Sequence, residues 1–200
     1  GNAIYKWAMF SALLISLAVL VLLIWSVLGD GLEVLIDRGL DFLTNGNSGD
    51  STTAGMWQAI YGSFFIALFV ALVAFPLGIA TAVYIEEYAG DSWFSSLISV
   101  NIRNLAGVPS IVYGLLGLTV FVKTLEGFTG GRSIIAGGLT LAILVLPIVI
   151  ITAAEALRAV PDSIREAGFG VGAARWEVVR GHVLPYAAPG ILTGTVLALA

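Results

Sequence analysis

Between Arg132 and Glu155 the sequence reads SIIAGGLTLAILVLPIVIITAA, a run without a single charged side chain. A helix needs about 20 mainly apolar residues to cross a bilayer, and residues 133–154 supply that length. A charge at the bilayer centre costs about 2.5–3.5 kcal/mol, so its absence over the whole run is informative. The run therefore predicts a transmembrane helix, with Pro147 inside it at a position that lipid-buried helices tolerate.

The composition of the whole chain also indicates a membrane protein. Of its 200 residues, 58% are hydrophobic and 11% are charged, and the mean hydropathy is +1.00. An ordinary soluble domain carries about 25% charged residues. A soluble core of this size cannot hide so much apolar surface, so we expect most of the chain to contact lipid.

Long apolar runs that have no charge, or a single charge in one case, predict four further spans. They cover residues 7–29, about 61–84, about 94–122 and 183–200. The third of these contains one charge, Arg103. The last begins with Pro185 near its start and stops without a polar exit, so we expect it to be truncated. Polar loops are expected at residues 30–50, 86–91 and 126–132.

Two stripes of small residues, spaced four apart, predict close helix packing. They are Ala74, Gly78 and Ala82, and then Gly190, Gly194 and Ala198. The predicted fold class is an all-α polytopic bundle. We divide it into residues 1–56, one helix and an extracytoplasmic loop, and residues 57–200, the core transmembrane domain.

Several kinds of chemistry are excluded by residue types that are missing or rare. Cysteine is absent and His182 is the single histidine, so we expect no thiol chemistry, metal site or catalytic residue. Lysine occurs at Lys6 and Lys123 alone, and neither closes a phosphate-binding Walker loop. We therefore expect no cofactor and no nucleic-acid partner, and any ATP must be bound by another subunit.

The distribution of basic residues predicts the orientation in the membrane. Four of the nine Lys and Arg residues follow the span at 133–154, namely Arg158, Arg165, Arg175 and Arg180. Cytoplasmic loops carry an excess of basic residues, so residues 155–185 are expected in the cytoplasm. Counting spans backward then puts the N-terminus inside and the acidic loop at residues 30–50 outside.

The basic loop has the pattern of two short helices joined by a glycine turn. Ser163 and Glu166 have the spacing of a capping box, which predicts a helix from Ile164. Glycines at 168, 170 and 172 are expected to end it. A second short helix is expected at residues 173–180, with Trp176 and Val179 on one face.

This loop resembles the EAA loop of ABC importer permeases. The resemblance rests on Glu166-Ala167-Gly168, then Gly172, then Leu184-Pro185. Gly168 departs from the family's second alanine and His182 from its isoleucine. The resemblance implies a coupling helix that contacts an ATPase subunit through Ser163, Glu166, Ala167, Gly168, Gly172, Ala173 and Trp176. The alternative is a solvated connector whose arginines merely follow the positive-inside rule.

A second stretch, residues 104–118, is similar to the third-helix signature of phosphate-specific permeases of the PstA type. This resemblance covers most of the chain from about residue 57. It implies a type I ABC importer permease with six spans in the cell inner membrane. It also implies a heterodimer with a related permease, two ATP-binding subunits and an extracytoplasmic phosphate-binding protein.

The same stretch contains the candidate substrate path. Gly107 and Pro109 interrupt the expected helix, which exposes backbone N–H groups to an oxyanion, and Ser110 adds a hydroxyl donor. Arg103 is either a cation on the path or an anchor that snorkels to the interface. Glu155 and Arg158 are expected to form an ion pair at a helix end, or a gate.

Three interpretations of the sequence are compared: two classes of transporter and a membrane protein without a transport function. The first is an ABC permease for phosphate or for another anion such as sulfate, molybdate or phosphonate. The second is a secondary transporter or channel. A purely structural membrane protein would need neither the basic loop nor a charge inside a span.

Overall fold

The structure is a computed structural model that describes residues 2–50, 52–90 and 92–199. The described residues form helices and turns and contain no strand, so the expected all-α class is confirmed. The chain divides into two compact units, Gly1–Tyr61 and Gly62–Ala200.

The first unit is dominated by α1 (Asn2–Thr44). The apolar side chains along its length are exposed, as suits a helix whose solvent is lipid. The loop expected at residues 30–50 is wrong for Asp30 to Thr44, because these residues continue the helix. Hydrophobic residues recur between the acidic ones in this stretch. The backbone stays helical through it, with a break at Gly39, where φ is 53°.

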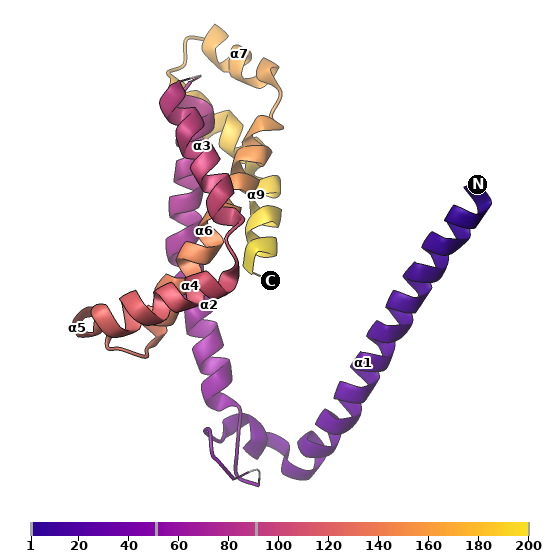
Figure 1. Cartoon of the computed structure of the whole chain (residues 1–200). Coiled ribbons are helices and arrows are strands. Elements are labelled where there is room, and N and C mark those ends of the chain that lie inside the picture. Colours follow the sequence, from indigo (N-terminus) through magenta and orange to yellow (C-terminus); the bar gives the residue numbers. More distant parts are fainter. Residues whose placement is uncertain (1, 51, 91, 200) are drawn as a thin grey trace. The chain divides into compact units, whose positions relative to one another are not determined.

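The core of the second unit is three long helices, α2 (Trp57–Val83), α6 (Ile134–Arg158) and α9 (Leu184–Leu199). α2 runs on into a π-helical turn, η1 (Tyr84–Tyr88). The polar loop expected from residue 86 therefore begins as helix, which corrects the expectation for Glu86, Glu87 and Tyr88. Figure 1 shows the three helices side by side, with α7 at one end of the bundle.

Both predicted small-residue stripes lie at helix contacts. A Cβ added at Gly78 would lie 2.6 Å from Val149 Cγ1 of α6, so α2 packs against α6 there without room for a larger residue. A Cβ at Gly194 would lie 2.6 Å from Thr152 Cβ, which places α9 equally close to α6. Small residues permit this approach, and the packing prediction is confirmed.

The span expected at residues 94–122 is broken. α3 (Trp93–Ala106) ends before Pro109, and α4 (Ser110–Leu116) with the π-helical η2 (Gly117–Thr124) leaves at 95°. The predicted interruption of this span is confirmed. Tyr113 is buried and donates a hydrogen bond of 2.9 Å to the carbonyl of Leu105, which ties the two halves together.

The short helix α5 (Glu126–Thr129) lies in the loop before α6. Among the described residues, four helices are long and apolar enough to cross a membrane, or five if the bent pair is one span. This range includes the five spans expected from the sequence. The chain is a multi-pass membrane protein by the length and composition of these helices.

Candidate functional site

The basic loop begins with α7 (Asp162–Gly170). The expected capping box is wrong, because Pro161 is the N-cap residue and no side chain caps the helix. Pro161 has extended backbone angles, and the helix starts directly after it, earlier than Ile164. Asp162 instead places a carboxylate in the first turn, where its negative charge interacts favourably with the positive end of the helix dipole.

Gly168 continues α7, which corrects the expectation for this glycine, whereas the helix does end at Gly170. Gly168 is buried, and an added Cβ would lie 2.7 Å from Cγ2 of Val178. Val178 is 1% exposed, so it has little room to move. The close approach of α7 to α8 explains why a glycine stands where the resembling family has alanine.

The turn after α7 depends on Gly172. Its φ is +82°, in the region that L-residues with a Cβ avoid. The Gly172 N–H donates to the carbonyl of Phe169 at 2.9 Å, and the Ala173 N–H donates to that of Gly168 at 3.2 Å. The predicted glycine turn is therefore confirmed.

The second short helix is not a separate element. α8 (Arg175–Val178) continues through a π-helical turn, η3 (Val179–Val183), into α9. Trp176 is exposed while Val179 is 1% exposed, so only one of the two residues expected on the apolar face is buried. The difference arises because Val178 and Val179 both pack into the core that α2, α6 and α9 build.

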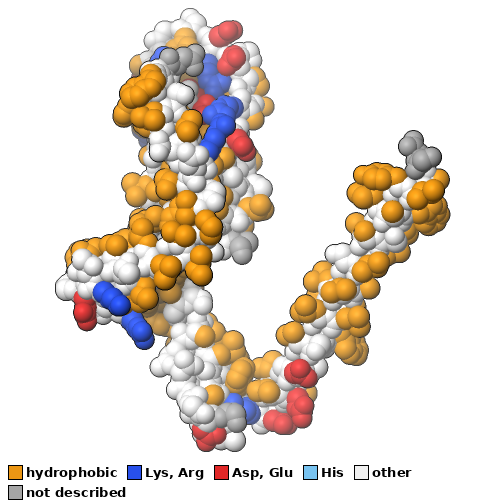
Figure 2. Space-filling view, in the orientation of Figure 1, with side chains coloured by type: hydrophobic (Ala, Val, Ile, Leu, Met, Phe, Trp, Pro, Cys, Tyr) orange, Lys and Arg blue, Asp and Glu red, His pale blue; other side chains and the backbone are white. Residues whose placement is uncertain are grey.

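The expected coupling residues present a mainly exposed surface at the end of unit 2. Ser163, Glu166, Ala167, Gly172 and Trp176 are exposed, Ala173 is half-buried and Gly168 is buried. Phe169 and Val171 add exposed apolar area, and Val171 is 83% exposed. Figure 2 shows charged side chains of both signs gathered at this end, whereas hydrophobic side chains cover much of the bundle.

Arg165 joins α7 to the rest of the bundle. Its Nη2 donates to Glu87 Oε1 at 2.8 Å and to the carbonyl of Leu157 at 2.9 Å, and its Nη1 donates to the carbonyl of Val160 at 2.8 Å. The hydrogen bond to Glu87 raises the pKa of Arg165. The guanidinium is therefore charged throughout the physiological range, and the contact does not switch there with pH.

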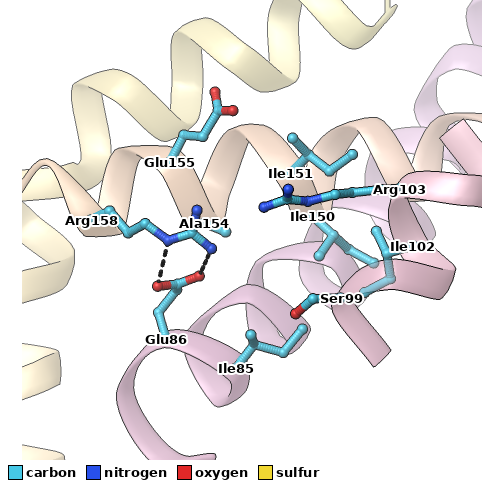
Figure 3. Close-up of a pocket in the computed structure, with 10 residues that line it drawn as sticks. All are labelled: Ile85, Glu86, Ser99, Ile102, Arg103, Ile150, Ile151, Ala154, Glu155 and Arg158. Carbon is cyan, nitrogen blue, oxygen red and sulfur yellow. Dashed lines mark hydrogen bonds and ion pairs between the residues drawn. The ribbon is translucent and has the colours of Figure 1, made fainter. Parts of the chain in front are cut away.

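Arg158 pairs with Glu86, across 72 residues of sequence, and not with Glu155. The Arg158 Nε donates to Glu86 Oε2 at 2.9 Å, and its Nη2 contacts the other carboxylate oxygen. The expected pair of Arg158 with Glu155 is wrong. Glu155 lies on the same helix but points away from the Glu86 contact (Figure 3).

This ion pair lines a cavity of about 310 Å³ in unit 2. Figure 3 shows the Arg103 guanidinium directed into the cavity from α3, opposite the Arg158 pair. Ser99 of α3 and Glu155 of α6 add polar groups, and the other lining residues are Ile85, Ile102, Ile150, Ile151 and Ala154. Within the described ranges no ion pair is formed by Arg103.

The broken part of α3 lies outside this cavity. Gly107 caps α3, Pro109 precedes α4 and Ser110 opens α4. All three are exposed, and none of them lines the cavity that holds Arg103. The structure thus separates the candidate path residues into a cavity group and a bend group one turn further along the chain.

Sequence reasoning missed Glu86 and Glu87 as functional candidates. It assigned them to a polar turn, although each holds an arginine of the basic loop. Two adjacent carboxylates at the end of an apolar run, in a chain with a separate arginine-rich loop, are a signal that could have indicated the pairing. Among the residues that the structure describes, no group of three acidic or histidine side chains could hold a metal ion.

Comparisons with known proteins identify the family. A model of the family described as "binding-protein-dependent transport system inner membrane component" matches residues 74–200. This range contains the cavity, the bend and the whole basic loop. The fold resembles that in a structure of the inward-facing MetNI methionine ABC transporter, with a TM-score of 0.56 and 21% identity over 72% of this chain and 66% of that chain.

Curated relatives carry the names of transport permeases. A probable ABC transporter permease, YqgH of Bacillus subtilis, is 37% identical over 85% of this chain and 58% of its own length. The phosphate transport system permease PstA 1 of Mycobacterium tuberculosis is 35% identical over 100% of this chain and 64% of its own. PstA of Yersinia pestis is 38% identical over 73% of this chain and 48% of its own.

The chain thus spans between about half and two thirds of the length of these relatives. The family match covers more than half of the chain and includes the basic loop and the packed helices α6 and α9. The helical bundle agrees with the fold of an ABC importer permease. The chain belongs to the family of inner membrane components of binding-protein-dependent transport systems.

Proposed function

We propose that the chain forms the transmembrane path of a permease subunit that imports inorganic phosphate, with ATP hydrolysed on a separate subunit. Several relatives are named phosphate transport permeases, which supports phosphate as the substrate. The single observation that carries the proposal is the exposed α7 with its turn at Gly172, inside the matched family region. The partners are a related permease, two ATPase subunits and an extracytoplasmic phosphate-binding protein.

The function is tested by uptake of radiolabelled phosphate into proteoliposomes that contain the complete complex. We expect uptake to require both ATP and the binding protein. Excess unlabelled sulfate, molybdate or phosphonate is expected to leave phosphate uptake unchanged. Uptake that proceeds without ATP would instead assign the protein to secondary transporters or channels.

The coupling residues Ser163 to Trp176 are proposed to contact the ATPase subunit from the cytoplasmic side. Their exposure and the apolar area of Phe169 and Val171 suit a protein partner. The basic composition of the loop supports a cytoplasmic location for it, and with five spans the N-terminus is proposed to lie on the same side. The acidic side of the first loop, around Asn47, then lies outside.

Single cysteines at Ala167 and Ala173 are expected to crosslink to the ATPase subunit in the assembled complex. The chain has no cysteine of its own, so each variant carries one thiol. Ala167 is exposed at the centre of the proposed contact, whereas Asn47 serves as the control on the opposite side. Crosslinks from Asn47 without crosslinks from the two alanines would contradict both the orientation and the contact.

The phosphate path is proposed to run past Arg103 and the bend at Gly107, Pro109 and Ser110. The Arg103 guanidinium supports this proposal because it is directed into a cavity and has no ion-pair partner among the described side chains. The bend adds backbone donors at the start of α4. A path needs favourable entry without a deep binding well, and a few donors with one cation provide that balance.

Replacing Arg103 separates a path residue from an interfacial anchor. Lysine keeps the charge and the anchor but loses the forked guanidinium that suits oxyanions. We expect Arg103→Lys and Arg103→Ala to insert normally and to lower phosphate uptake by about tenfold or more. An anchor predicts near-normal uptake for lysine and poor insertion for alanine, and that pattern would refute the path assignment.

A further inference from the structure

We propose that the turn η1 receives the movement of residues 163–176, which we call the coupling segment. The turn passes this movement to the ion pair of Glu86 and Arg158, which lines the Arg103 cavity. The proposal rests on the proposed function, because it assumes that an ATPase subunit moves α7. It assigns roles to Glu86, Glu87 and Tyr88, which we call the receiving triplet. These are positioning residues, because they act on the cavity through other side chains.

The first observation is that three consecutive residues hold three arginines from three successive elements. Glu86 pairs with Arg158 at the end of α6, and Glu87 pairs with Arg165 of α7 at 2.8 Å. The ring of Tyr88 lies under the guanidinium of Arg175 in α8, 5.9 Å from the ring centroid. The whole basic loop is therefore fastened to one turn at the end of α2.

The second observation concerns the strength of the central contact. The side chain of Glu87 is 8% exposed, and that of Arg165 is 20% exposed. The same guanidinium also binds two carbonyls near the end of α6, at Leu157 and Val160. Removing one partner of such a buried pair leaves an uncompensated charge, so α7 cannot shift without moving Glu87 or breaking a costly contact.

The third observation links the contact to the cavity. Glu86 and Arg158 line the cavity that Arg103 enters. They also line a groove of about 390 Å³ that is bounded by Glu87, Asp162, Arg165, Phe169 and Arg175. One ion pair thus forms a wall of both spaces. Because Glu86 and Glu87 are neighbours on one turn, a displacement of Glu87 also displaces Glu86 relative to Arg158.

The backbone of the receiving triplet suits this role. Residues 84–88 form a π-helical turn, and another π-helical turn, at residues 179–183, follows α8. Single π-helical turns inside helices occur frequently at functional sites. The receiving triplet therefore lies in one such turn, and another such turn leads from α8 into α9.

A purely structural reading assigns the same contacts to folding of the loop. The two readings differ in the amount of phosphate moved per ATP hydrolysed. A structural role predicts that assembly, ATP hydrolysis and uptake fall together by one factor. A transmitting role predicts that the complex assembles and hydrolyses ATP while the phosphate moved per ATP falls.

The first test replaces Glu87 with glutamine, which keeps the shape of the side chain and removes its charge. In the complete reconstituted complex we expect Glu87→Gln to lower the phosphate moved per ATP by about tenfold, with the ATPase subunit still copurifying. The matched control is Arg180→Gln in the same loop, since Arg180 is exposed and has no ion pair among the described residues. The control is expected to change the ratio by less than about twofold.

The second test replaces the ion pair with a covalent tether. A Glu87→Cys, Arg165→Cys double variant has the only two thiols of the chain, and a short reducible bifunctional reagent joins them. Before linking we expect the double variant to move little phosphate per ATP hydrolysed. After linking we expect recovery to at least half of the wild-type value, and on reduction we expect this recovery to be lost. Recovery through a tether that carries no charge shows that the contact transmits movement.

Three outcomes would overturn the proposal. These are a wild-type ratio in Glu87→Gln, a joint fall of assembly and uptake in both variants, and a linked double variant that does not recover. The substrate is judged separately, on the wild-type complex in the same preparation. If that complex carries another anion, the phosphate assignment fails, and the ratio is measured with that anion.

Discussion

Replacing Gly78 with alanine is expected to destabilise the bundle by about 1–3 kcal/mol, because it forces α2 and α6 apart. The added Cβ would lie 2.6 Å from Val149 Cγ1 and 3.0 Å from Val149 Cβ. Val149 is fully buried, and its β-branched side chain has no second rotamer of low energy in a helix. The clash therefore has to be relieved by a shift of one helix, which also opens the contacts at Ala74 and Ala82.

Thermal unfolding of the purified protein in detergent measures this effect as a lower melting temperature. Gly62→Ala is the matched control, because it makes the same substitution in the same helix with nothing within 4 Å of the added Cβ. Alanine is a better helix former than glycine, so the control is expected to be unchanged or more stable. Equal melting temperatures for the two variants would show that α2 does not approach α6 at Gly78.

Replacing Gly172 with valine is expected to abolish phosphate uptake while membrane insertion and assembly remain near normal. The φ of +82° suits glycine, and a left-handed backbone costs roughly 1–2 kcal/mol for residues with a Cβ. A β-branched side chain makes that conformation worse. The chain relieves the strain by changing the turn, which moves Ala173 and Val178 away from their places beside Gly168 of α7.

Insertion is expected to survive because Gly172 is exposed and an added Cβ meets nothing within 4 Å. The measurements are phosphate uptake, ATP hydrolysis and copurification of the ATPase subunit. Gly170→Val is the control, since Gly170 is two residues away, equally open and not at positive φ. Uptake by Gly172→Val at the level of the control would show that the turn geometry has no part in coupling.

The positions of the long helices, though not their exact boundaries, could be predicted because the constraint on them is local. The runs without charge located the helices because each backbone group in lipid must be satisfied within its own helix. The turn at Gly172 was also predictable, since a glycine among small residues is the residue type that positive φ requires. The helical stretch from Asp30 to Thr44 was missed because acidic residues were taken as evidence for a loop.

The angle of the α3 break could not be read from its residues. Gly107 and Pro109 predict an interruption, but their chemistry allows a slight kink as well as the observed 95° bend. The bend is held by Tyr113, whose hydroxyl reaches the carbonyl of Leu105 across the break. Such a contact depends on how α4 packs, and packing is a property of the whole unit.

The pairing of the charged side chains could not be predicted from the sequence either. Glu155 and Arg158 are one helical turn apart, so sequence spacing alone favoured their pairing. In the structure Glu86 competes for the same arginine from the end of another helix, with two hydrogen bonds in fork geometry. Nothing in the spacing of residues 86 and 158 indicates that these two positions meet.

The sequence by itself determined the helical class, the places of the membrane helices and the glycine turn of the coupling segment. Each of these follows from a requirement that neighbouring residues meet among themselves, such as an uncharged run in lipid or a positive φ. Only the tertiary structure decided which arginine meets which carboxylate, that Gly168 lies against Val178, and which residues share the Arg103 cavity. These features depend on contacts between distant segments, whose free energy is gained only when the helices pack.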